Sequence, residues 1–172
     1  MDKNELLAEL HEAASGFLQA FSSFTQEQVN IVPFEGSWTA GQVAEHILKS
    51  ASGVLGALTG QAEATARNPE EHVALLRKIF LDFNTKMKGP DIVAPSSEPK
   101  DKEALTGALI AAFSGIREAA EGKDLLKTFP AFPLPGLGEL TGVEFVNFIT
   151  VHIKRHIHQL QNIAAKLPHA NA

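Results

Sequence analysis

The sequence has no cysteine among its 172 residues. Disulfide bonds, cysteine-ligated zinc, iron–sulfur clusters and a cysteine nucleophile are therefore excluded for this chain. Any thiol chemistry would need a thiol supplied by a small molecule. A chain of this length is expected to form one domain, residues 1–172, with a hydrophobic core that needs no covalent cross-links.

Long apolar runs and clusters of positive charge are also missing. No stretch of about 18 uninterrupted apolar residues occurs, and the amino terminus is charged and amphipathic, so no transmembrane helix or signal peptide is predicted. The formal charge is −5, and Lys154 and Arg155 are only an isolated basic pair, which argues against a nucleic-acid surface. We expect a cytoplasmic protein that binds neither membranes nor nucleic acids.

The periodicity of apolar residues is helical, and no segment shows the sustained alternation typical of strands. Capping residues mark the helix starts: Asp2 with Glu5, Thr39 with Gln42, Asn68 before Pro69, Asp101, and Thr141 with Glu144. We therefore predict five helical segments in an all-α bundle: residues 2–24, 39–60, 69–88, 101–122, and from 141 towards the C-terminus.

The segment before the last helix, residues 129–138, is rich in proline and phenylalanine. It is long enough to form a crossover instead of a tight hairpin, so the helices need not follow simple up-down-up-down order. It is either a plain connector or part of a pocket rim.

Two histidines of the last helix, His152 and His156, lie on its apolar stripe together with Ile149 and Leu160. Buried imidazole nitrogens need hydrogen bonds or coordination, and residues four apart on a helix present their side chains to one point. The spacing therefore fits either a hydrogen-bonded core pair or two ligands of a transition metal.

A third ligand can be sought among the other histidines. His46 lies beside the apolar stripe of the second helix, and the residues one turn further on, Ser50 and Gly53, are small enough to leave room. On pattern alone His46 is a candidate, not a certain ligand. The remaining four are predicted to lie at the surface or its boundary, with His158 facing solvent: His11, His72, His158 and His169.

Several familiar metal and nucleotide sites are excluded by spacing. A zinc protease needs glutamate directly after the first histidine, where this chain has Ile153. Di-iron bundles need glutamate three residues before each histidine, and these positions are apolar. Neither a glycine-rich phosphate loop nor a G-x-S-x-G motif is present. The choice is between a mononuclear histidine-rich site and no site.

Three motifs in order along most of the chain resemble the DinB/YfiT-like superfamily: Gly36-Ser-Trp-Thr-Ala-Gly-Gln-Val-Ala-Glu-His46, Gly138-Glu-Leu-Thr-Gly-Val-Glu144, and His152-x-x-x-His156 followed by Gln159-Leu160. In that family a tryptophan followed by Ser or Thr opens the second helix, whose histidine joins two from the last helix around a divalent metal. The resemblance implies a four-helix bundle with an extra helical segment and a metal site formed by His46, His152 and His156.

Three neutral imidazoles leave an open coordination position, as in catalytic sites, where a metal can ionise water or a thiol. Nickel, zinc and iron(II) all accept imidazole. Because the ordinary histidine pKa is about 6.5, we expect metal affinity to fall as the pH drops below about 7.

The resemblance implies a thiol-dependent S-transferase, with a low-molecular-weight thiol as cosubstrate, or a metal-dependent hydrolase. The alternative is a non-enzymatic, metal-binding or stress-associated bundle protein. The expected partners are a small-molecule substrate and, as a homodimer, a second copy of the chain.

No catalytic acid or base can be assigned from the sequence. Glu45 and Glu144 are candidates for orienting the ligands or for proton transfer, although each also fits a cap or a solvated helix face. Trp38 is expected to pack at the entry of the second helix, with a place in a pocket wall as the alternative.

Overall fold

The computed structural model describes residues 2–167, and within them it confirms an all-α bundle class. The long helices are α1 (Lys3–Ser22), α2 (Ala40–Thr59), α4 (Lys102–Gly122) and α5 (Gly142–Lys166), and α3 (Val73–Phe80) is short. Two 3-10 turns, η1 (Gln28–Asn30) and η2 (Asp91–Val93), and two strands, β1 (Thr128–Leu134) and β2 (Gly138–Thr141), complete the described elements.

The four long helices begin where their capping residues predict. The Thr39 hydroxyl accepts a hydrogen bond from the Gln42 backbone at 3.1 Å, and the Gln42 side chain accepts one from the Thr39 backbone at 3.0 Å. Thr141 and Glu144 form the same reciprocal pair at the start of α5. These contacts satisfy backbone N–H groups that have no partner within the helix, which fixes the helix start.

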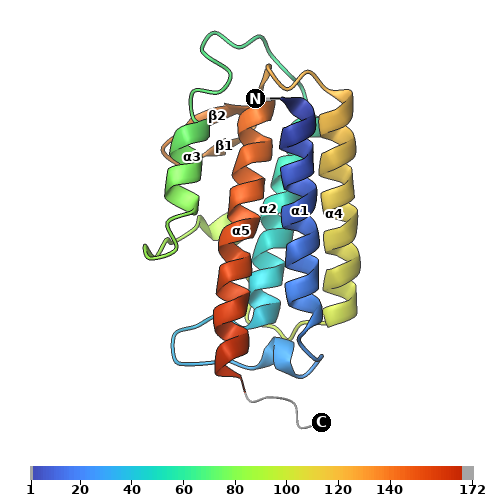
Figure 1. Cartoon of the computed structure of the whole chain (residues 1–172), viewed down its shortest axis with the longest axis vertical. Coiled ribbons are helices and arrows are strands. Elements are labelled where there is room, and N and C mark those ends of the chain that lie inside the picture. The colour runs from blue at the N-terminus through green and yellow to red at the C-terminus, as the bar shows by residue number, and fades with distance from the viewer. Residues whose placement is uncertain (1, 168–172) are drawn as a thin grey trace.

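The four long helices form a ring in which α1 contacts α5, α5 contacts α2, α2 contacts α4, and α4 contacts α1. In Figure 1, α1 and α5 run downward while α2 and α4 run upward, so the four long helices taken in chain order do not alternate in direction. The connection between α4 and α5 therefore joins helices that lie diagonally across the ring, as expected of a crossover. No helix among residues 2–167 combines the length and hydropathy needed to cross a membrane.

The core is densest around the first half of α5, because α1, α2 and α3 all pack against this helix. Residues 142–153 are buried on every side. Phe17 and Phe21 of α1 and Ile47 of α2 contribute fully buried side chains to the same core. Burial of each such side chain contributes about 1.5–3 kcal/mol, so α5 is firmly held around His152.

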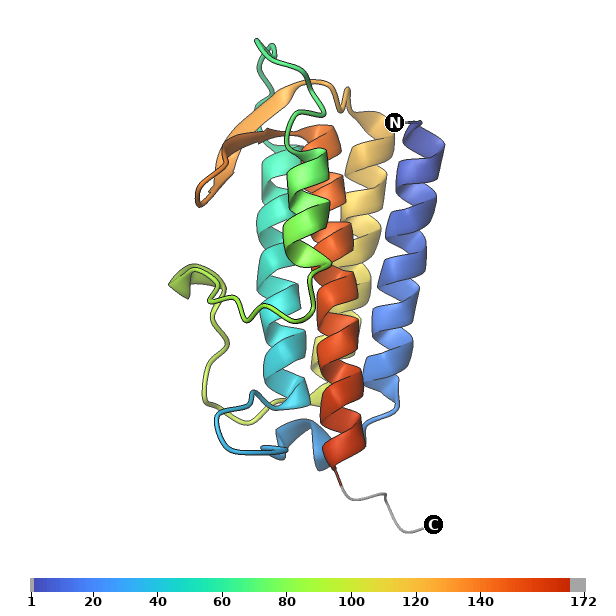
Figure 2. The ribbon, with the colours of Figure 1, turned by 60° about the vertical axis from the view of Figure 1, so that its left-hand side comes forward.

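The predicted absence of strands is wrong for residues 128–141, which form an antiparallel hairpin that projects from the bundle (Figure 2). Thr128 pairs with Thr141 and Phe129 with Leu140, and the register then shifts before Leu134. Pro130 cannot donate a ladder hydrogen bond, and the prolines hide the alternation of apolar side chains that would indicate a strand. The crossover is therefore ordered by a short ladder.

The third helix is also shorter than predicted, with only eight residues. Beyond it, the Asp82 carboxylate accepts hydrogen bonds from the backbone N–H two residues on and from the Thr85 hydroxyl. Arg155 of α5 donates to the backbone carbonyls of Asp82 and Thr85. Both interactions compete with helical hydrogen bonds, so the chain leaves the helix and follows the side of the bundle as a loop.

Candidate metal centre

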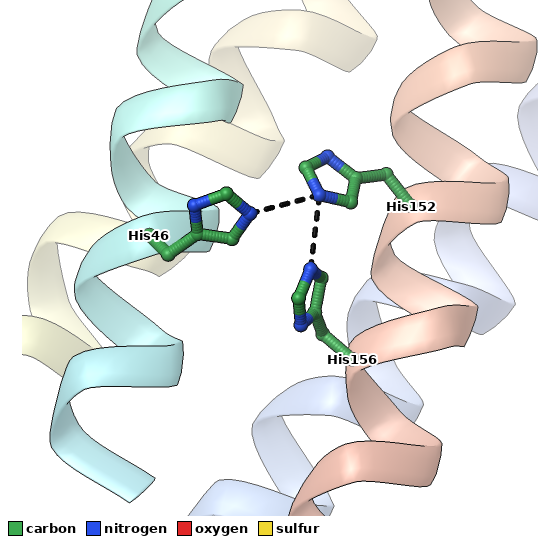
Figure 3. Close-up of side chains that lie close together, drawn as sticks. All are labelled: His46, His152 and His156. Carbon is green, nitrogen blue, oxygen red and sulfur yellow. Dashed lines mark hydrogen bonds between the residues drawn. The ribbon is translucent and has the colours of Figure 1, made fainter. Parts of the chain in front are cut away.

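Three histidines converge in the interior between α2 and α5 (Figure 3). The Nε2 atom of His152 lies 2.9 Å from Nε2 of His46 and 3.0 Å from Nε2 of His156. Their side chains are buried, with exposed fractions of 4%, 6% and 8% for His46, His152 and His156. The structure thus brings together all three residues that the sequence analysis nominated as ligands.

Aromatic rings hold the imidazoles in place. The ring of Trp38 lies 5.1 Å from that of His46, measured between centroids. Phe80 of α3 and Phe148 of α5 lie 5.3 Å and 5.2 Å from the His152 ring. These contacts limit rotation of the imidazoles, so the three nitrogens are held near one another before any ligand binds.

Hydrogen bonds fix the tautomers of two of the histidines. The Nδ1 atom of His46 lies 2.8 Å from the carbonyl oxygen of Val93, and that of His156 lies 2.6 Å from the side-chain oxygen of Gln159. Because these oxygens can only accept, both Nδ1 atoms carry the proton. Both Nε2 atoms therefore present a lone pair to the centre.

His152 completes the set in a different way. Its Nδ1 atom is buried and has no hydrogen-bond partner in the described part of the chain. Without a metal, the N–H group at Nε2 of His152 can donate a shared hydrogen bond to the Nε2 atoms of His46 and His156. A bound metal would require the proton on Nδ1 of His152, so that His46, His152 and His156 could each offer an Nε2 lone pair. The residues therefore fit a divalent transition metal.

Burial keeps all three imidazoles neutral. It lowers the pKa of His46 and, more strongly, that of His152. Burial, followed by repulsion from His46, lowers the pKa of His156 from 6.5 to about 3. Neutral imidazole is the form that coordinates metals, so the fold already supplies the protonation state that a metal needs.

A cavity of about 880 Å³ opens onto the three histidines. Trp38 lines it, as the pocket-wall alternative predicted, and so do side chains from α3, α5, the loop after α3 and the tip of the hairpin. The Pro-rich segment therefore contributes to the pocket rim as well as connecting two helices. A concave cavity of this size beside three convergent imidazoles is typical of a small-molecule site.

The two glutamates considered in the sequence analysis are occupied elsewhere. Glu45 forms an ion pair with Lys100 at 2.6 Å, and Glu144 accepts two hydrogen bonds from Arg67 at 2.6 and 2.7 Å. Neither lines the cavity. Both instead fix segments of the chain against the bundle, which agrees with the structural alternative given for each.

The remaining histidines stand apart from the centre. His158 is not solvent-facing as predicted: it is half-buried because Phe83 from the loop stacks on its ring at 4.6 Å. His11 is exposed and His72 occupies the N-cap position of α3, both consistent with boundary positions. The prediction for His169 lies outside the described residues.

Sequence reasoning missed the residues that orient the ligands. Gln159 stands three positions after His156, a spacing that places both side chains on one helix face, so its role had a signal. The carbonyl of Val93 had none, because a backbone oxygen is invisible in a sequence pattern. Val93 also lies 47 positions after His46 in the chain.

Comparisons with known proteins agree with this fold. A family model described as the DinB superfamily matches residues 9–160. The uncharacterized protein YuaE of Bacillus subtilis (strain 168) is 24% identical over 157 residues, which cover 85% of this chain and 89% of YuaE. The structure of YfiT from Bacillus subtilis superposes with a TM-score of 0.61 at 18% identity, covering 95% of this chain and 86% of YfiT. YfiT is described as a probable metal-dependent hydrolase with an unusual four-helix bundle topology.

Proposed function

Because this chain belongs to the DinB superfamily, we propose that its three-histidine centre binds a divalent metal and that the protein is a metal-dependent hydrolase of a small substrate. The observation that carries the proposal is the convergence of three imidazole nitrogens at the wall of a large cavity. The description of YfiT as a probable metal-dependent hydrolase supports the same reaction class.

A bound ion would supply Lewis acidity that activates a nucleophile at its open coordination position. His46, His152 and His156 would hold it, and zinc, nickel and iron(II) all suit imidazole ligands. Hydrogen bonds to Val93 and Gln159 orient two of the imidazoles and increase their basicity. Apolar side chains make up much of the cavity wall next to these imidazoles.

A second candidate is transfer of a low-molecular-weight thiol to an electrophile. No aspartate or glutamate of the described chain lines the cavity to take a proton from water. A thiol needs less assistance because its ordinary pKa is about 8.5. In this reaction a sulfur–carbon bond forms, the bond to the leaving group breaks, and the thiol proton leaves with that group.

The test begins with metal content after purification without an affinity tag. Protein loaded with zinc, nickel or iron(II) is then assayed for ester and amide hydrolysis, with and without small thiols and an electrophilic acceptor. Turnover without thiol supports hydrolysis, and turnover that requires thiol supports transfer. If metal raises the melting temperature but no turnover occurs with any ion, the non-enzymatic metal-binding or stress-associated alternative replaces the enzyme.

Variants separate the metal centre from contaminating activity. His152→Ala and His156→Ala should abolish both stoichiometric metal binding and turnover. His11→Ala, at an exposed position on α1, should retain both. Equal turnover in all three variants would assign the activity to another protein in the preparation. Light scattering of the same samples tests the expected homodimer.

A further inference from the structure

The cavity has a charge opposite to that of the whole chain. The protein carries 20 acidic and 15 basic side chains, with a formal net charge of −5. Yet none of the 20 acidic residues lines the cavity, whereas Lys86, Lys88 and Arg155 do. A lining with positive charge and no carboxylate attracts anions and repels cations.

Two of these charges lie on the loop that passes directly over the metal centre. A Cβ atom added to Gly89 would lie 3.5 Å from Cε1 of His46, so the backbone beside Lys88 lies close to that ligand. A few residues later the same loop supplies the Val93 carbonyl to His46. Lys86 and Lys88 form no ion pair with any described residue, which leaves their charges available.

The third charge, on Arg155, is held in place by the loop after α3. Its guanidinium group donates to the carbonyl oxygens of Asp82, at 2.6 Å, and Thr85. Arg155 directly precedes His156 on α5. The nearby Asp82 carboxylate accepts hydrogen bonds from the backbone of Asn84 and the hydroxyl of Thr85, and its charge partly offsets that of Arg155. Arg155 therefore serves mainly to anchor the loop, and the two lysines supply the charge that no nearby carboxylate offsets.

Most of the remaining lining is apolar. Phe34, Leu75, Phe83 and Met87 line it with 41% to 51% of their surface exposed, a high fraction for large apolar side chains. Apolar residues exposed together at a cavity mouth are typical of a binding site. The volume of about 880 Å³ is within the range of about 300–1,000 Å³ found for sites that bind drug-sized molecules.

We propose that the cavity selects small molecules with an apolar aromatic or alkyl body and an anionic head group, a carboxylate or phosphate, held by Lys86 and Lys88 beside the metal centre. This substrate class rests on the proposed function, because it assigns the cavity to the substrate of the metal centre. The apolar walls contribute burial of the body, while the loop charges select the sign of the head group.

The test uses four probes with one body: 4-phenylbutyrate, 4-phenylbutyramide, 4-phenylbutylamine and the phosphate monoester of 4-phenylbutanol. Binding is measured with metal-free protein, so that a carboxylate cannot gain affinity by coordinating an ion. Trp38 is the one tryptophan of the chain and lines the cavity, so its fluorescence reports occupancy. Calorimetry provides an independent dissociation constant.

We expect at least one of the two anions to bind about fivefold or more tightly than the amide, and the amine to bind most weakly. Replacing both lysines, Lys86→Gln with Lys88→Gln, should lower the anion-to-amide ratio about two- to fivefold per lysine, since exposed ion pairs are individually weak. Lys78→Gln, at an exposed α3 position outside the cavity, should leave the ratio unchanged.

Several results would overturn the substrate class: no binding of any probe, equal affinity for anion and amide, or the same ratio in the double variant as in the wild type. Zinc binding is titrated separately in each variant. If wild-type protein binds no zinc but prefers the anions, the metal centre alone is refuted. If wild-type protein binds zinc but shows no anion preference, this inference alone is refuted.

Discussion

In the metal-free protein, the buried histidines should make stability depend strongly on pH between 7 and 5. His156 has a pKa of about 3 in the fold and about 6.5 in an unfolded chain. The unfolded state therefore binds the extra proton first. The stability due to neutral His156 is complete above pH 6.5 and is lost as the pH falls towards 3.

The size of the effect follows from that shift. Each pH unit below 6.5 costs about 1.4 kcal/mol for one such group, so protonation of the unfolded state at pH 5 removes about 2 kcal/mol. The burial of His46 and His152 adds losses of the same sign. Small domains are commonly stable by only about 5–15 kcal/mol, so the loss is readily measured.

Urea unfolding of metal-free protein at pH 7, 6 and 5 measures this loss directly. Wild type and His156→Gln are compared, and the variant should lose about 2 kcal/mol less between pH 7 and pH 5. His11→Gln, at an exposed position, should behave as wild type. The hydrogen bond from Arg77 lowers the pKa of Glu9 from 4.5 to about 2, so that carboxyl affects stability only below this pH window. Parallel losses in wild type and His156→Gln would show that His156 is not held neutral.

Three further outcomes can be measured. Burial lowers the pKa of every proposed ligand, so the zinc affinity of the folded protein should change little between pH 7 and 5.5. Ordinary histidines would lose affinity over this range. Chelator competition at several pH values distinguishes the two outcomes. Gln159→Leu should weaken zinc binding by about 10–100-fold by freeing an imidazole, whereas the exposed Gln161→Leu should not, as calorimetry would show. Glu144→Gln should lower the free energy of unfolding by about 1.5–3 kcal/mol, because it breaks the paired hydrogen bonds with Arg67. Glu71→Gln removes a longer, exposed contact with Arg67 and should lower it by no more than about 0.5 kcal/mol. Urea unfolding measures both changes.

The sequence was sufficient for features that depend on local contacts. Reciprocal caps at Thr39 and Thr141 set the starts of α2 and α5, and the four-residue spacing of His152 and His156 placed both rings on one face. These interactions involve residues within one helical turn, so spacing alone describes them. His46 needed the family resemblance, because its partners lie on another helix.

Features that depend on distant contacts were not predictable in the same way. The early end of α3 depends on Arg155, which lies some seventy positions later and binds two loop carbonyls. The hairpin depends on a ladder interrupted by prolines, and its tip faces the cavity. Sequence patterns that depend only on neighbouring residues predict neither the end of α3 nor the hairpin. These two segments form much of the cavity wall, so its shape was less predictable than its metal ligands.

The loop after α3 makes the shape of the cavity and the electronic character of the proposed metal interdependent. Val93 orients His46 from the same loop that carries Lys88 and Gly89. A molecule that displaces this loop to gain space would lengthen the hydrogen bond to His46 and weaken its donation to the ion. Redesign of this protein for bulkier ligands should therefore begin at the hairpin tip, which contacts the cavity without holding a ligand imidazole.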